Sequence, residues 1–238
     1  MPWFGPVVTM LLSGSPAHAP HDCLAPLAWS ESSSSRATDE LLPLVVVLHG
    51  RGQEARDLEW LGRDLAAARV VFLEGPIPQR DGRAWFTRRL RHLEPRARQR
   101  QLAERREEVA LTVQRIAACR PTRGRPILVG YSQGASVALA VAWAYPELTG
   151  DVVAVAAYLD PSLEAASAPR ETGLRFVHGA ADRRLPARPV RKTARHLRRS
   201  GVAVRWHPVS NSGHALDRGL RQGLRAELTQ AVSASGSS

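Results

Sequence analysis

The sequence has 238 residues, of which 44% are hydrophobic, and this is enough for one sizeable core and short for two. Its formal charge of +11 would suit an anionic partner, but nearly all of the basic residues are arginines that are spread along the chain. The composition therefore predicts a single domain and does not favour a nucleic-acid-binding protein.

The cysteines and the N-terminal segment argue against several other classes of protein. Cys23 and Cys119 cannot form a framework of several disulfides, and neither has Cys or His neighbours at metal-ligand spacing, so we expect a reduced protein without a metal. Residues 4–12 form a short apolar run and residues 17–19 are similar to a signal-peptidase site, but no basic residue precedes the run. We therefore favour a cytoplasmic location over secretion. No segment approaches the roughly 20 apolar residues of a membrane-spanning helix, so stable membrane insertion is not expected.

Strand and helix patterns begin near residue 41. Residues 1–40 lack a clear period and predict a loose N-terminal extension, whereas residues 41–238 predict the folded domain. Continuous apolar runs, typical of strands buried on both faces, occur at residues 42–48, 70–73, 126–129, 152–156, 174–177 and 202–206. Spacings of three and four predict helices at residues 55–68, 96–119, 133–145, 190–197 and 216–228, and residues 74–95 predict a long loop. This alternation predicts an α/β fold with a mostly parallel central sheet and helices on both faces.

A glycine-rich segment lies between a predicted strand and a predicted helix. Gly130-Tyr131-Ser132-Gln133-Gly134 matches the pattern G-x-S-x-G, in which a tight turn from strand to helix exposes the hydroxyl of the central serine. Glycines are needed two positions before and two after the serine, because neighbouring side chains crowd so tight a turn. The start of the following helix also favours developing negative charge. The pattern therefore predicts Ser132 as a nucleophile toward an acyl carbonyl.

Residues downstream of Ser132 fit the two partners that a serine nucleophile requires. A serine hydroxyl is a weak nucleophile near neutral pH, so it needs a histidine base and an acid that orients the imidazole. In α/β-hydrolases with this motif the chain order is Ser, then Asp or Glu, then His. His214, after the last predicted strand, fits the base, and Asp182, after the strand before it, fits the acid. Asp160, after the preceding strand, stays open as the alternative acid.

Two backbone N–H groups are expected to bind the oxyanion of the tetrahedral intermediate. Removing one such donor typically lowers the rate by about a hundredfold to a thousandfold. The N–H of Gln133, directly after the serine, is the first expected donor. The second is the main chain of Arg51 in the segment Leu48-His49-Gly50-Arg51-Gly52, because its glycines let the backbone approach a substrate.

These segments together resemble the phospholipase/carboxylesterase family, which includes acyl-protein thioesterases and small bacterial carboxylesterases. The likeness rests on residues 48–52, 130–135, 178–186 and 213–214. It implies an α/β-hydrolase fold without a large lid domain, acting on acyl esters, lysophospholipids or acyl thioesters. It also implies that Trp85 and Phe86, similar to an aromatic pair in the family's long loop, border the substrate site. The chain departs from the family pattern at Arg51, where an apolar residue is frequent, and at residues 156–160.

The combined prediction is a serine hydrolase that cleaves carboxylic esters through an acyl-enzyme, with Ser132, Asp182 and His214 as catalytic residues and without a cofactor. The expected partner is a small-molecule acyl ester or thioester, with no nucleic acid, and monomer and homodimer both stay open. Two alternatives remain. One is another acyl hydrolase of the same fold, such as an arylesterase or a peptidase. The other is a catalytically silent protein that binds through its basic surface.

Overall fold

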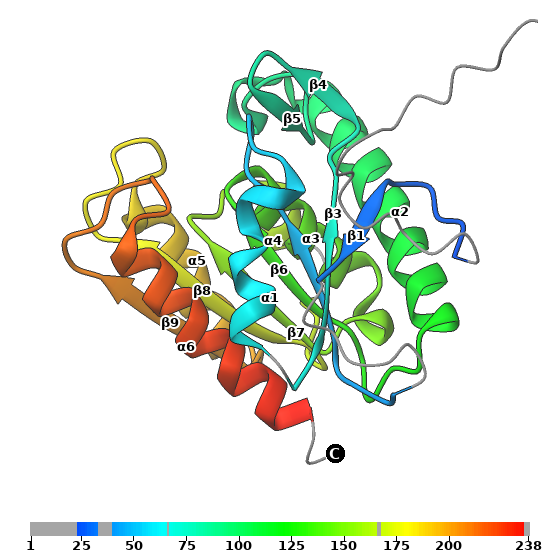
Figure 1. Ribbon diagram of the computed structural model, residues 1–238. Coiled ribbons are helices and arrows are strands. Elements are labelled where there is room, and N and C mark those ends of the chain that lie inside the picture. Colours follow the sequence, from blue (N-terminus) through cyan, green and yellow to red (C-terminus); the bar gives the residue numbers. More distant parts are fainter. Residues whose placement is uncertain (1–22, 33–39, 66, 166–167, 236–238) are drawn as a thin grey trace, which may run out of the picture.

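The computed structural model describes residues 23–32, 40–65, 67–165 and 168–235, so the apolar run at residues 4–12 lies outside the described residues. Within them, seven strands form one sheet in the order β1-β3-β2-β6-β7-β8-β9 (Figure 1). The edge strand β1 (Trp29–Glu31) runs antiparallel to β3, and all other neighbouring strands in this sheet are parallel. The parallel strands are β2 (Leu44–Leu48), β3 (Arg69–Leu73), β6 (Ile127–Tyr131), β7 (Asp151–Val155), β8 (Gly173–Gly179) and β9 (Val204–Val209).

Helices cover both faces of this sheet, as predicted. One face carries α2 (Pro95–Cys119), α3 (Gln133–Ala144) and α5 (Ala187–Arg199), and the other carries α1 (Trp60–Asp64) and α6 (Arg218–Ser235), which lie in front of the sheet in Figure 1. Alternate residues of β2 pack into the two cores, Val46 into the first and Val47 into the second. Every residue of β2 is buried, which explains why its sequence is continuously apolar.

Several short elements differ from the predicted ones. The helix expected at residues 55–68 is divided into a 3₁₀ turn, η1 (Ala55–Leu58), and the short α1, although its apolar stripe is buried as expected. The loop expected at residues 74–95 contains a small sheet of β4 (Ile77–Gln79) and β5 (Gly82–Ala84), followed by the 3₁₀ turn η2 (Leu90–His92). Two further short helices, η3 (Pro146–Leu148) and α4 (Pro161–Ala165), were not predicted. Three-residue strands that are largely not buried leave no apolar run to recognise.

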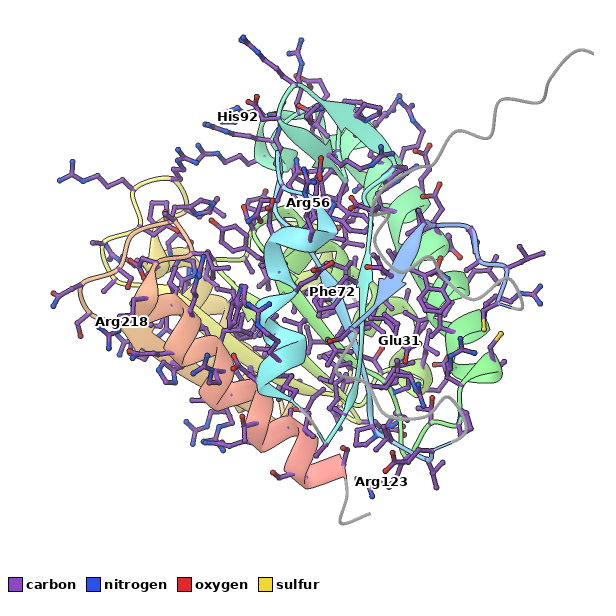
Figure 2. The ribbon with its side chains drawn as sticks, viewed as in Figure 1. Glu31, Arg56, Phe72, His92, Arg123 and Arg218 are labelled. Atoms are coloured by element: carbon purple, nitrogen blue, oxygen red, sulfur yellow. The ribbon has the colours of Figure 1, made fainter. Side chains whose placement is uncertain are left out.

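The prediction of a loose extension over residues 1–40 does not hold for residues 29–31, which form β1. Trp29 is buried, and the carboxylate of Glu31, labelled in Figure 2, pairs with two buried arginines of the folded domain. Its oxygens lie 2.6 Å from Nη1 of Arg69 and 3.4 Å from Nε of Arg120. These two arginines lie far from Glu31 in the sequence, so no local sequence pattern predicted the strand. Among the described residues, no helix combines the length and the apolarity that crossing a membrane would require.

Candidate active site

Ser132 lies at the turn between β6 and α3, in a backbone conformation that residues other than glycine rarely adopt. Its φ is 53° and its ψ is −107°. The turn tolerates no side chain at its two glycines: a Cβ on Gly130 would lie 2.4 Å from the backbone of Ala135, and a Cβ on Gly134 would lie 2.3 Å from the carbonyl oxygen of Leu48. This crowding is the physical reason for the glycine spacing. The turn places Ser132 at the carboxyl edge of the sheet.

Ser132, His214 and Asp182 form one chain of hydrogen bonds. The Oγ atom of Ser132 lies 3.0 Å from Nε2 of His214, and Nδ1 of His214 lies 2.7 Å from Oδ2 of Asp182. The three residues follow β6, β9 and β8, whose carboxyl ends meet at one edge because the strands are parallel. A neutral imidazole with its proton on Nδ1 donates to the carboxylate and accepts from the serine hydroxyl. The arrangement can therefore take a proton from Ser132.

The carboxylate of Asp182 is buried and accepts several hydrogen bonds. Its Oδ1 accepts from the backbone N–H groups of Arg184 and Leu185, both at 2.8 Å. Burial by itself would raise the pKa of Asp182, but the hydrogen bonds from His214 and from these two amides outweigh burial and hold the pKa of Asp182 below its ordinary value. The side chain therefore stays ionised and can orient His214.

Asp160, the alternative acid, has other partners. Its Oδ1 accepts from the backbone N–H and the hydroxyl of Ser162, at 2.9 and 2.6 Å, at the start of α4. Its Oδ2 lies 2.5 Å from Nε of Arg98. One carboxylate oxygen of Asp160 thus bonds to Ser162 and the other forms an ion pair with Arg98. The structure places Asp182, not Asp160, against His214.

The two expected oxyanion donors border one cavity. Arg51 and Gln133 both line the cavity that Ser132 lines. Neither backbone N–H has an acceptor within the part of the chain that the structure describes. Gln133 is the first residue of α3, where helical hydrogen bonding leaves N–H groups unsatisfied. The loop of Arg51 is held by the N–H of Gly52, which donates to the carbonyl of Arg83 at 2.8 Å. Two such donors at one cavity can bind a developing negative charge.

Trp85 and Phe86 were expected to border the substrate, and the structure places them elsewhere. Both side chains are 0% exposed, and neither lines the cavity over Ser132. The indole N–H of Trp85 donates to the carbonyl of His49 at 2.8 Å, and the backbone N–H of Trp85 donates to the side chain of Gln133 at 3.1 Å. Trp85 therefore connects the loop after β2 to the start of α3. Trp85 thus acts as a packing residue that supports these two segments instead of contacting the cavity.

The cavity over Ser132 has a volume of about 390 Å³. Its apolar lining comes from Leu90, Tyr131, Tyr158 and Leu185, and the remainder is polar and strongly basic. The volume is at the lower end of the range for small-molecule sites. No group of three or more His, Cys, Asp or Glu side chains in the described residues could hold a metal ion.

His178 supports the site, and the sequence assigned it no role. Its Nε2–H donates to the carbonyl of Leu185 at 2.8 Å, and its ring stacks on Trp206 with the centroids 5.8 Å apart. Burial lowers the pKa of His178, so the imidazole is neutral near pH 7. The residue holds the loop that carries Asp182. Its position four residues before Asp182, at the end of a buried strand, was the only sequence signal for this role.

Comparisons with known proteins agree with the fold. The family model for phospholipase/carboxylesterase matches residues 33–226. A solved structure of the esterase PE8 is 25% identical and has a TM-score of 0.72, and the alignment covers 86% of this chain and 99% of that one. A carboxylesterase of Bacillus cereus is 18% identical with a TM-score of 0.73, covering 86% and 94% of the two chains. A carboxylesterase of Mesorhizobium loti is 22% identical with a TM-score of 0.62, covering 86% and 95%. No curated protein sequence matches. The predicted α/β-hydrolase fold and the family resemblance are confirmed.

Proposed function

Because the chain belongs to the phospholipase/carboxylesterase family, we propose that it is a serine esterase that hydrolyses carboxylic esters through an acyl-enzyme on Ser132. The observation that carries this proposal is the unbroken chain of hydrogen bonds from Ser132 through His214 to Asp182. Two backbone N–H groups at the same cavity, which have no acceptor among the described residues, support it further.

Acylation uses the groups already in contact. The Oγ atom of Ser132 attacks the ester carbonyl carbon while its proton passes to Nε2 of His214, and the ionised Asp182 stabilises the imidazolium that forms. The carbonyl oxygen becomes an oxyanion that accepts from the N–H groups of Arg51 and Gln133. As the bond to the leaving alcohol breaks, Nε2 of His214 returns the proton to the leaving oxygen.

Deacylation repeats these steps with water as the nucleophile. His214 takes a proton from a water molecule, which attacks the acyl carbonyl, and the second tetrahedral intermediate uses the same two N–H groups. When the bond to Oγ breaks, Ser132 regains its proton and the carboxylic acid leaves. The net reaction consumes one water and needs no other reactant.

Labelling with a fluorophosphonate probe tests the nucleophile. We expect the wild type to be labelled and Ser132→Ala not to be labelled, with turnover of p-nitrophenyl butyrate lowered at least about a thousandfold. Ser200→Ala, at the end of α5 and outside the lining of the cavity, is the matched control and should still be labelled. A wild type that resists the probe, or equal labelling of Ser132→Ala, would refute the proposal and favour a catalytically silent binding protein.

A second assay separates esters from the other acyl substrates of this fold. Rates with butyryl esters, butyryl thioesters and butyryl amides of matched leaving groups would be compared. The proposal predicts that esters have the highest kcat/KM. A preference for amides would identify a peptidase, and a preference for thioesters would move the physiological substrate to an acyl thioester with the same nucleophile.

A further inference from the structure

Most of the charged residues that line the cavity over Ser132 are cations. The five arginines in its lining are Arg51, Arg80, Arg89, Arg91 and Arg184, and the single acidic residue among them is Asp81. All five arginines are exposed. Within the described residues none of the five forms an ion pair, whereas arginines elsewhere, such as Arg69, Arg98 and Arg175, are paired with carboxylates.

These arginines reach the cavity from separate parts of the chain. Arg51 follows β2, Arg80 lies at the β4–β5 turn, and Arg184 lies in the loop after β8; Arg89 and Arg91 flank Leu90 at η2. Figure 2 shows several nitrogen-tipped side chains projecting around His92, which ends η2. Tertiary structure therefore collects cations that the sequence distributes over more than a hundred positions.

Two of the arginines are held by neutral acceptors. The guanidinium of Arg51 donates twice to Oε1 of Gln79, at 3.3 and 2.9 Å, and Nη1 of Arg91 donates to the carbonyl of Arg184 at 2.7 Å. Such bonds orient a guanidinium without neutralising its charge. For Arg80 and Arg89, no side-chain partner occurs in the described part of the chain.

Like charges around one small cavity repel one another, and salt screens this repulsion fully only beyond a Debye length of about 8 Å at physiological ionic strength. An anion at the cavity offsets part of this repulsion. The planar guanidinium suits carboxylate and phosphate in particular, since it can donate two parallel hydrogen bonds to either group. A neutral ester can accept hydrogen bonds from these side chains but gains no charge–charge attraction from them.

We propose that the substrate of this esterase carries an anionic group, a carboxylate or a phosphate, in addition to the ester, and that the arginines of the cavity bind this group. The inference rests on the proposed ester hydrolysis. The apolar residues Leu90, Tyr158 and Leu185 contact the uncharged part of the substrate. Hydrolysis itself is unchanged: the ester bond breaks, and water supplies the hydroxyl of the acid and the hydrogen of the alcohol.

Two matched pairs of esters test this proposal on the full-length protein. The first pair places a carboxylate on the acyl side: the p-nitrophenyl monoester of adipic acid against p-nitrophenyl hexanoate. The second places a phosphate on the alcohol side: butyryl-glycerophosphate against monobutyrin. We expect kcat/KM for at least one charged ester to exceed that of its neutral counterpart by about tenfold at low salt. Each exposed ion pair with an arginine contributes only modestly to binding, and several contribute together. The advantage should shrink at high salt.

A pair of charge-matched variants assigns the preference to the cavity. Arg80→Gln with Arg89→Gln should lower the ratio of charged to neutral kcat/KM by about fivefold. Arg191→Gln with Arg195→Gln removes the same charge from the exposed side of α5, where these residues line a different hollow, and should leave the ratio unchanged.

The outcomes separate this inference from the proposed function. Turnover of p-nitrophenyl hexanoate that is lost in Ser132→Ala, with no preference for either charged ester, would overturn the anionic substrate and leave the esterase in place. An equal loss of preference in both double variants would also overturn it, because the effect would then come from overall charge. Absence of turnover for all four esters would overturn both.

Discussion

The hydroxyl of Tyr131 donates a hydrogen bond to the carbonyl oxygen of His214, with the two oxygens 2.8 Å apart. The rings of the two residues also contact each other, with centroids 5.8 Å apart. Tyr131 directly precedes Ser132, so this bond ties the turn that carries the serine to the loop that carries the histidine. In the sequence, Tyr131 occupied a variable position of the motif and had no predicted role.

Removing this hydroxyl should loosen His214 while keeping the ring contact. We predict that Tyr131→Phe lowers kcat about three- to tenfold with little change in KM, because small displacements of a catalytic group cost rate. The free energy of unfolding should fall by about 1 kcal/mol. Steady-state kinetics and urea unfolding measure the two effects. The control is Tyr145→Phe, which removes a hydroxyl that bonds to Glu107 on α2 and should leave kcat unaltered. A wild-type kcat in Tyr131→Phe would rule out the positioning role.

Substituting each candidate acid in turn should distinguish them by rate. We predict that Asp182→Asn lowers kcat by about 10⁴-fold, because an amide can hold the imidazole in the wrong tautomer. Asp160→Asn should lower kcat less than about tenfold, although it weakens the ion pair with Arg98 and so reduces stability. Kinetics with p-nitrophenyl butyrate, together with thermal unfolding, compare the two variants. A larger loss of kcat in Asp160→Asn would reverse the assignment.

Two buried histidines should make stability depend on pH. Burial lowers the pKa of both His49 and His178. Below the ordinary value of about 6.5 the unfolded chain therefore binds more protons than the folded chain. The stabilising contribution of the two histidines is complete above that pH. It is lost as the pH falls toward their lowered pKa values in the folded chain. We predict that the free energy of unfolding decreases from pH 7 to pH 5.

Urea titrations at several pH values between these limits check this. His178→Gln, whose amide can still donate to the carbonyl of Leu185, should flatten the dependence because one of the two groups is gone. A variant with the wild-type slope would show that His178 contributes no such proton uptake.

The ion pair that anchors β1 should be worth far more than a surface pair. In Glu31→Gln the side chain of Arg69, which is 0% exposed, loses its carboxylate partner, and we predict a destabilisation of about 3 kcal/mol. The control is Glu171→Gln, whose pair with Arg125 has side chains 75% and 40% exposed and should cost less than about 1 kcal/mol. Chemical unfolding measures both. Equal costs would mean that β1 contributes little to the fold.

The sequence by itself determined the α/β alternation and the candidate residues Ser132, Asp182 and His214. Strands of a parallel sheet are buried on both faces, so their sequences are continuous apolar runs. The strands β2, β6 and β8 were recognisable for that reason. Residues that follow such strands must share one edge of the sheet. Local sequence therefore contained the order of the elements and the neighbourhood of the site.

Only the tertiary structure decided which side chains meet at that edge. In the fold, Asp182 bonds to His214, Asp160 forms an ion pair with Arg98, and Trp85 is buried. It also collected the cavity arginines, as in the bond between Arg91 and Arg184, which lie 93 residues apart. Such contacts depend on the packing of distant loops, which no local period encodes. The candidate nucleophile could be predicted from five consecutive residues, whereas the charge and shape of its cavity depend on the whole fold.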